Sequence, residues 1–239
     1  MQEMSSFKRG LKDGLPICFG YISVAFAFGI FALDSGLSIL EALLISMTNV
    51  TSAGQLAAVP IIISGGSILE LLLSQIVINL RYALMSVSLS QKLSKSVRLF
   101  DRFIIAFVNT DEVFAVASSK PKNVGRRYLY GLILTPFLGW SFGTFLGAYA
   151  GNILPHSLVS ALGIAIYGMF IAIVVPQTKK RRADLCCVLF AIILSCLFKY
   201  LPLLSFIPSG FTIIICACIA SVLFAFISPI EVKEEAENE

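Results

Sequence analysis

Residues 67–89 read SILELLLSQIVINLRYALMSVSL, an almost continuously apolar run with an arginine, Arg81, well inside it. The run is long enough to cross a bilayer as a helix, since about 20 apolar residues span the hydrocarbon core. A helix is expected because a segment surrounded by lipid must satisfy its own backbone hydrogen bonds. This stretch therefore predicts a transmembrane helix that carries a charged group at membrane depth.

The composition of the whole chain is that of an integral membrane protein. Of its 239 residues, 57% are hydrophobic and 13% are charged, and the mean hydropathy is +0.90. Soluble domains are nearer half apolar and a quarter charged, so a water-soluble fold of this size could not cover so much apolar surface. The lipid bilayer is the expected solvent. The net charge of +4 is modest and gives no reason to expect nucleic-acid binding.

Seven further hydrophobic segments accompany residues 67–89. They cover roughly residues 14–33, 39–62, 103–118, 128–150, 153–175, 184–200 and 206–228. We expect an all-α integral membrane protein, a polytopic bundle of six to eight hydrophobic helices. One transmembrane transporter domain should cover residues 1–230, and an acidic, disordered tail should follow at 231–239.

The basic residues between these segments predict the orientation of the chain. Lys and Arg concentrate in cytoplasmic loops, which places the N-terminus and the loops 120–127 and 179–182 in the cytoplasm. A topology with eight complete crossings places these three basic regions in the cytoplasm. It also places Lys92, Lys95, Arg98 and Arg102 outside the cell, which violates the same rule. If segments 39–62 and 103–118 are broken or re-entrant, six spans remain and every basic loop is cytoplasmic. Both topologies stay open, and both put the two termini on the cytoplasmic side of the inner membrane.

Segments 39–62 and 103–118 both have polar residues in their interiors. Residues 48–55 read TNVTSAGQ, and residues 109–112 read NTDE. Irregular backbone at membrane depth is tolerated only where protein buries it or a wet cavity lies beside it, and paired interrupted segments are typical of transport sites. A break at Gly54 would free backbone groups that, with Gln55, could bind a zwitterion. Helix packing through small residues explains the first stretch equally well.

Asn79 and Arg81 are polar residues inside the apolar run 67–89. An arginine near the bilayer centre costs at least about 2.5–3.5 kcal/mol on insertion scales, so an interaction must offset that cost. A guanidinium is suited to bidentate binding of a carboxylate, from a substrate or from the protein. The alternatives to a substrate site are a permanent ion pair with Asp111 or Glu112, and snorkelling toward the interface.

Asp111 and Glu112 are adjacent carboxylates within an otherwise apolar stretch. On a helix they point about 100° apart, so one can face a cavity while the other forms an ion pair or a cap. Carboxyl groups at membrane depth are typical of proton relays. This pattern predicts a proton-coupling role for the pair. If the segment instead lies at the interface, both acids are simply hydrated.

Nothing in the sequence indicates an enzyme, a metal site or a cofactor. The six cysteines lie in apolar segments without metal-site spacing to His156, the one histidine, and are expected to be small buried hydrophobic residues. An HExxH motif and a nucleotide-binding glycine loop are absent. Gly139, Gly143 and Gly147 recur every four residues and predict close helix contact, within the chain or with a partner subunit.

Several of these motifs together resemble the AzlC family, the large permease subunit of two-component branched-chain amino acid exporters. The resemblance rests on GLKDGLP (residues 10–16), AGQLAA (53–58), NLRY (79–82) and TDEVF (110–114), in that order, and on Trp140-xx-Gly143-Thr144-xx-Gly147. It covers the chain up to the fifth segment and is compositional beyond it. The family often has a histidine after the arginine, where this chain has Tyr82.

The resemblance implies export of leucine, isoleucine, valine or similar neutral aliphatic amino acids across the cytoplasmic membrane. It also implies coupling to the proton gradient and a small AzlD-type membrane subunit as partner. The alternatives are a transporter or channel for another small neutral solute, and a non-transporting membrane assembly factor.

The site residues follow from the same interpretation. Arg81 would bind the substrate carboxylate. Asn79, Gln55 and the broken backbone near Gly54 would bind the other polar groups of the substrate. Asp111 or Glu112 would neutralise the amino group or carry the coupling proton.

Overall fold

A computed structural model describes residues 6–120, 123–155, 171, 175, 178–179, 181–201, 204 and 206–228. The chain divides into two compact units, Met1–Met169 (unit 1) and Phe170–Glu239 (unit 2). Regular structure within the described residues is helical, with no strand, which confirms the expected all-α class. The predicted segment 153–175 lies largely outside the described residues, as does the tail 231–239. The single domain over 1–230 stays a prediction.

Within the described residues, five helices are long and apolar enough to cross a membrane. They are α1 (Phe7–Asp34), α4 (Ile68–Ser90), α7 (Arg126–Ile153), α9 (Arg182–Tyr200) and α10 (Ser209–Ile227). Each corresponds to one of the predicted segments. The helix α1 begins earlier than the apolar run, because Ser6 caps it and accepts a hydrogen bond from the Arg9 amide (3.4 Å).

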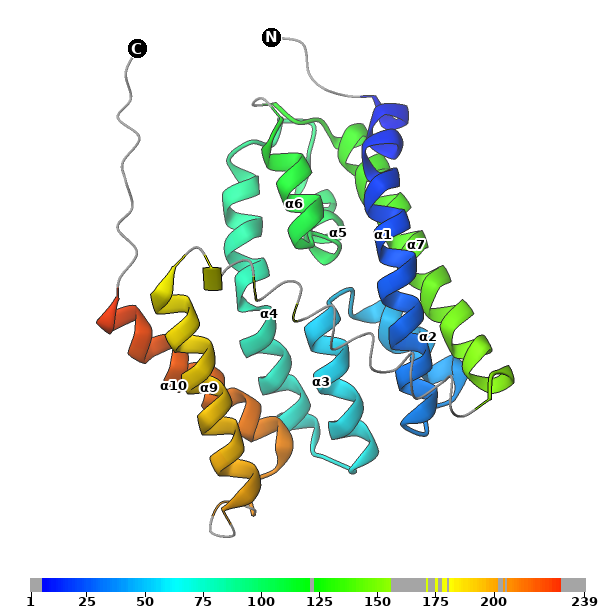
Figure 1. The fold of residues 1–239 in the computed structure, drawn as a ribbon. Helices are drawn as coiled ribbons and strands as arrows, with labels where there is room; N and C mark the ends of the chain where they lie inside the picture. Colours follow the sequence, from blue (N-terminus) through cyan, green and yellow to red (C-terminus); the bar gives the residue numbers. More distant parts are fainter. Residues whose placement is uncertain are drawn as a thin grey trace. The chain divides into compact units, whose positions relative to one another are not determined.

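The long helices α1 and α4 run in opposite directions through unit 1 (Figure 1). The end of α4 is tied to the loop after residue 118 by the Leu93–Val124 bridge. That loop returns to the start of α1, where Lys120 Nζ lies 2.8 Å from Asp13 Oδ2. The described basic residues of unit 1 other than Arg81 therefore gather at one end, called the basic end here: Lys8, Arg9, Lys12, Lys92, Lys95, Arg98, Arg102, Lys120, Arg126 and Arg127.

Segment 39–62 folds as a broken hairpin that enters unit 1 from the opposite end. It consists of α2 (Ile39–Thr48) and α3 (Ser52–Ile63), each too short to cross a bilayer. A capping box of Ser38 and Glu41 begins α2. The chain leaves helical geometry at Asn49 (φ −139°, ψ 83°) and reverses, and Thr51 begins α3 in an extended conformation.

Segment 103–118 forms the second hairpin, which enters from the basic end. Its halves are α5 (Leu99–Phe107) and α6 (Asp111–Ser118), separated by Val108–Thr110. Asp101 fixes the start of α5 by accepting hydrogen bonds from the Arg98 amide and the Tyr130 hydroxyl, both 2.8 Å. The prediction of two broken or re-entrant segments is thus confirmed. Residues 92–102 also lie at the same end as the N-terminus, as the topology with re-entrant segments requires.

Helices α1–α2–α3 and α4–α5–α6 form two repeats of opposite direction. Each repeat is a long helix followed by a hairpin that is broken at its tip (Figure 1). Each tip contains an asparagine, Asn49 or Asn109, followed by a threonine that begins the second half, Thr51 or Thr110. Inverted repeats with broken helices are a recurrent transporter architecture, with the binding site near the broken segments.

Helix α7 packs along α1 over most of its length, in the same direction. A side-chain carbon at Gly139, Gly143 or Gly147 would overlap the backbone of α1 at Cys18, Ile22 and Phe26, respectively. These glycines therefore allow the two backbones to touch. The predicted close helix contact is confirmed, and it lies within the chain.

We expect Gly147→Ala to destabilise the protein by about 1–3 kcal/mol, because the added methyl group forces α1 and α7 apart. Gly20→Ala is the matched control, since a side-chain carbon at that position of α1 has no neighbour within 4 Å. Thermal unfolding in detergent compares the two variants. Equal stability of both would contradict the close contact.

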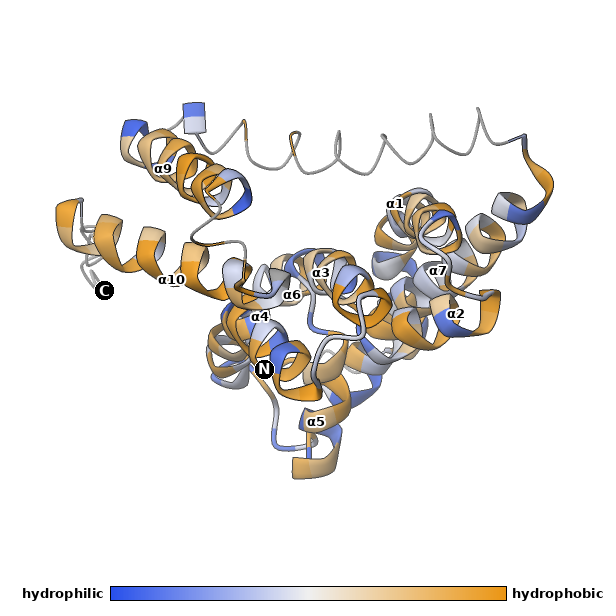
Figure 2. Ribbon diagram, turned by 90° about the horizontal axis from the view of Figure 1, so that it is seen from below, coloured by the Kyte–Doolittle hydropathy of each residue, from blue (hydrophilic) through white to orange (hydrophobic). Residues whose placement is uncertain are grey.

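Unit 2 contains an antiparallel pair of helices, α9 and α10. The Arg181 guanidinium before α9 donates to the Ser228 hydroxyl (2.9 Å) after α10, which holds the two open ends together. The rings of Phe190 and Phe224 lie 6.1 Å apart between the helices. Hydrophobic residues predominate along both helices (Figure 2).

The cysteines are free, but burial was wrongly predicted for half of them. Cys216 is buried, Cys18 and Cys187 are partly buried, and Cys186, Cys196 and Cys218 are exposed. The reason is that lipid and protein interior are both apolar, so a thiol is suited to either side of a membrane helix.

Candidate functional site

Arg81 lies near the middle of α4, between the levels of the two hairpin tips. Gln75 of α4 contacts the first tip and Ser86 contacts the second. Arg81 is six residues from one and five from the other, which is about 9 Å and about 7.5 Å along a helix. The arginine is therefore placed where the two repeats meet.

The Arg81 guanidinium forms an ion pair with Asp111, the first residue of α6. Nη2 lies 2.8 Å from Asp111 Oδ2, and the side chains are 54% and 46% exposed. Nη2 also donates to the Tyr82 hydroxyl (3.0 Å), and the guanidinium lies 4.9 Å from the centre of the Tyr82 ring. The pair is therefore half-open, with part of each charged side chain exposed.

Glu112 has different surroundings from its neighbour Asp111. Its Oε2 lies 2.5 Å from the hydroxyl of Tyr21 on α1, and that hydroxyl is 2.6 Å from Thr110 Oγ1. The Tyr21 ring packs edge-on against Trp140 of α7, with centroids 4.9 Å apart. The two acids thus point toward different helices, as their adjacency on a helix predicts. Sequence analysis missed Tyr21, although a tyrosine within an apolar span was a visible signal.

Gln75 organises the first hairpin tip. Its Oε1 accepts hydrogen bonds from Asn49 Nδ2 (2.9 Å) and Asn79 Nδ2 (3.2 Å), and its Nε2 donates to the Gly54 carbonyl (2.9 Å). A side chain at Gly54 would collide with Thr51 and Gln75. Asn79 and Gly54 are thus joined through Gln75, a residue that was not predicted to belong to the site.

Gln55 is fully buried, and neither polar atom of its amide has a hydrogen-bond partner among the described residues. The same is true of one oxygen in each of two other amides, Asn79 Oδ1 and Asn109 Oδ1. An unsatisfied buried polar group costs about 1–3 kcal/mol, and such groups call for an explanation such as a bound water or ligand. All three amides lie on or beside the broken hairpins.

The six predicted site residues therefore form two groups and two separate residues, Gln55 and Glu112, of which Glu112 accepts a hydrogen bond from Tyr21. Arg81 and Asp111 are in direct contact, and Asn79 is linked to Gly54. Gln55 shares no described hydrogen bond with either group. Among the described residues, no cluster of three or more His, Cys, Asp or Glu side chains is arranged to hold a metal ion.

The part of the chain that matches a known protein family includes both hairpins and the Arg81–Asp111 ion pair. A family model described as "AzlC protein" matches residues 16–154, which include every residue of the candidate site. The chain belongs to the AzlC family. No solved structure matches it.

Curated relatives of this AzlC-family chain are membrane proteins. A membrane protein of Archaeoglobus fulgidus is 36% identical over 184 residues, covering 76% of this chain and 80% of its own length. The inner membrane protein YgaZ of Escherichia coli is 28% identical over 229 residues, covering 93% of this chain and 92% of its own. A membrane protein of Helicobacter pylori is 21% identical over 184 residues, covering 74% and 79%.

Proposed function

We propose that this AzlC-family protein is a secondary transporter subunit that exports branched-chain amino acids across the cytoplasmic membrane. The observation that carries the proposal is the half-open Arg81–Asp111 pair, held between two opposed broken hairpins. Transporters with inverted repeats bind their solutes at such positions.

The charges of the pair complement a zwitterion. In the proposed bound state the Arg81 guanidinium binds the α-carboxylate, and Asp111 binds the α-ammonium group. When the substrate binds, the Arg81–Asp111 ion pair opens. Each side chain then pairs with a charged group of the substrate in place of its protein partner, so no unpaired charge remains at membrane depth. Gln55 and Asn79 supply further hydrogen bonds through their unpartnered amide atoms. Aliphatic neighbours receive the substrate side chain.

Glu112 is the better candidate for the coupling proton, because Asp111 is engaged by Arg81. Its hydrogen bond from the Tyr21 hydroxyl connects it to α1, in the other repeat. A proton on Glu112 would change this contact and so link protonation to the relative position of the repeats. Proton relays at membrane depth are built from such carboxyl groups.

We expect Glu112→Gln to abolish coupling and to retain transport down a leucine gradient. In inverted vesicles the lumen corresponds to the cell exterior, so an acid lumen should drive leucine accumulation in the wild type. The variant should show leucine counterflow without this stimulation. Stimulation of the variant equal to that of the wild type would exclude Glu112 as the coupling group.

The exposed surface of α4 supports a small AzlD-type subunit as partner. Its side chains Ile76, Leu80 and Leu84 are 53%, 60% and 69% exposed, beside the half-open Arg81. A small apolar subunit on this face would keep the arginine from contact with lipid, which is costly for a cation.

Transport into inverted vesicles tests the proposed function. Vesicles that contain the chain, with the small subunit if its gene is adjacent, are supplied with labelled leucine, isoleucine, valine, alanine and lysine. Saturable accumulation of the three branched-chain amino acids supports the proposal. Accumulation of a different neutral solute, or of none, favours one of the two alternatives.

A further inference from the structure

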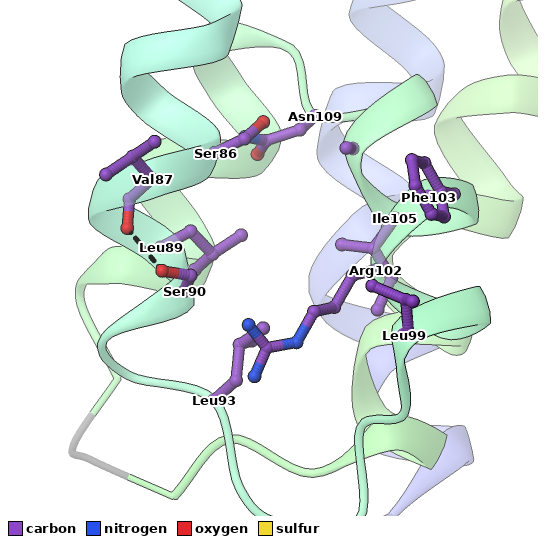
Figure 3. Close-up of a pocket in the computed structure, with 11 residues that line it drawn as sticks. Ser86, Val87, Leu89, Ser90, Leu93, Leu99, Arg102, Phe103, Ile105 and Asn109 are labelled. Carbon is purple, nitrogen blue, oxygen red and sulfur yellow. Dashed lines mark hydrogen bonds between the residues drawn. The ribbon is translucent and has the colours of Figure 1, made fainter.

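A cavity of about 270 Å³ lies between the last turns of α4 and helix α5 (Figure 3). It is separate from the Arg81–Asp111 pair, and its walls are mostly apolar. Leu89 and Ile105 form the buried part of the wall, while Val87 and Phe103 are largely exposed.

Arg102 is the charged residue that lines this cavity, and it lies at the basic end. Its side chain extends from α5 toward Leu93 and Ser90 of the facing wall (Figure 3). No described residue forms an ion pair with its guanidinium. An unpaired guanidinium beside an apolar wall is suited to a ligand with one anionic group and an aliphatic portion.

The inner end of the cavity reaches the second hairpin tip. Asn109 Nδ2 donates to Ser86 Oγ (3.2 Å), while Asn109 Oδ1 is buried without a described partner. Ser86 follows Arg81 by five residues, about 7.5 Å along α4. The inner end of the cavity therefore lies at the tip that leads into α6, whose first residue is Asp111.

The size of the cavity favours a small amphiphile. At about 30 Å³ for each water-sized group, the cavity holds roughly nine such groups. This corresponds to the size of an aliphatic amino acid.

We propose that the α4–α5 cavity is an outer binding site for aliphatic amino acids, in which Arg102 binds the carboxylate and the apolar wall receives the side chain. This inference rests on the proposed function and on the predicted cytoplasmic location of the basic end. The substrate binds here first and then moves past Asn109 to the central pair.

The test is the concentration dependence of leucine transport into inverted vesicles, which expose the cytoplasmic face. Arg102→Gln should raise the half-saturating leucine concentration about fivefold, the scale of an exposed ion pair, with an unchanged maximal rate. Lys95→Gln is the control, because it removes the same charge from the neighbouring loop outside the cavity. Ala106→Leu, which narrows the cavity, should weaken leucine transport more than alanine transport.

The outcomes separate this site from the central one. If Arg102→Gln and Ala106→Leu both match the wild type while Arg81→Gln is inactive, the outer site is refuted and the proposed function stands. If the wild type transports no aliphatic amino acid, both proposals fail. Transport in proteoliposomes of defined lipid identifies the anionic group that Arg102 binds. If Arg102→Gln raises the half-saturating leucine concentration in purely zwitterionic lipid, the group is the substrate carboxylate. If it does so only in anionic lipid, Arg102 binds a lipid headgroup and the proposal is refuted.

Discussion

Arg81→Gln should reduce leucine export by at least about 30-fold. In the proposed bound state the substrate covers the half-open pair and its carboxylate binds the Arg81 guanidinium, so these charges are desolvated; loss of one partner of such a charge pair costs about 2–5 kcal/mol. The lower figure corresponds to about 30-fold. Arg81→Lys should give an intermediate rate, because a lysine retains the charge but cannot bind a carboxylate in bidentate fashion. Arg127→Gln, an exposed arginine at the basic end, is the control.

The double variant Arg81→Gln/Asp111→Asn distinguishes a substrate site from a structural ion pair. If the pair only holds α4 against α6, removing both charges together leaves no unpaired charge and should restore transport. If the pair binds the zwitterion, the double variant should stay inactive although it folds and inserts. Recovery to half of the wild-type rate or more would refute the binding role.

Gln55→Leu should have opposite effects on stability and transport. Its amide is buried and unpartnered, so an apolar side chain of similar size removes a penalty of about 1–3 kcal/mol. The unfolding temperature should therefore rise or stay constant. Transport should fall by about tenfold, because one hydrogen bond to the substrate, about 0.5–1.5 kcal/mol net, is lost along with the orientation it provides.

Gln75→Leu provides the contrast to Gln55→Leu. Gln75 forms hydrogen bonds with Asn49, Gly54 and Asn79, so its replacement should lower both stability and transport. If Gln55→Leu behaves in the same way as Gln75→Leu, then Gln55 supports the hairpin and does not bind the substrate.

Much of this architecture could be predicted from sequence because charge and hydropathy constrain it. Eight complete crossings would place the basic residues 92–102 outside the cell, and this conflict raised two re-entrant segments as one of two open topologies. Contact between Arg81 and one of the two acids could be anticipated because each charge is costly alone at membrane depth, but the choice between Asp111 and Glu112 was left open. The polar stretches 48–55 and 109–112 marked both tips.

The rest depended on information that hydropathy does not contain. A membrane helix requires only an apolar sequence, so two repeats can have the same fold with little sequence similarity. Here they share little beyond the Asn and Thr residues of the two tips, Asn49–Thr51 and Asn109–Thr110. The repeats were therefore not recognised from the sequence. Gln75 and Tyr21 looked unremarkable because their partners, apart from Asn79, are 21 to 91 residues away along the chain. Lipid-facing and buried positions are equally apolar, which is why the exposed cysteines were misjudged.

Direct binding of labelled leucine to the purified protein in lipid nanodiscs tests the central claim most directly. The protein is purified with any subunit that accompanies it, and the wild type is compared with Arg81→Gln/Asp111→Asn and Glu112→Gln. We expect saturable binding by the wild type and by Glu112→Gln, and none by the double variant at equal thermal stability. Binding of unchanged affinity to the double variant would contradict a substrate site at the Arg81–Asp111 pair.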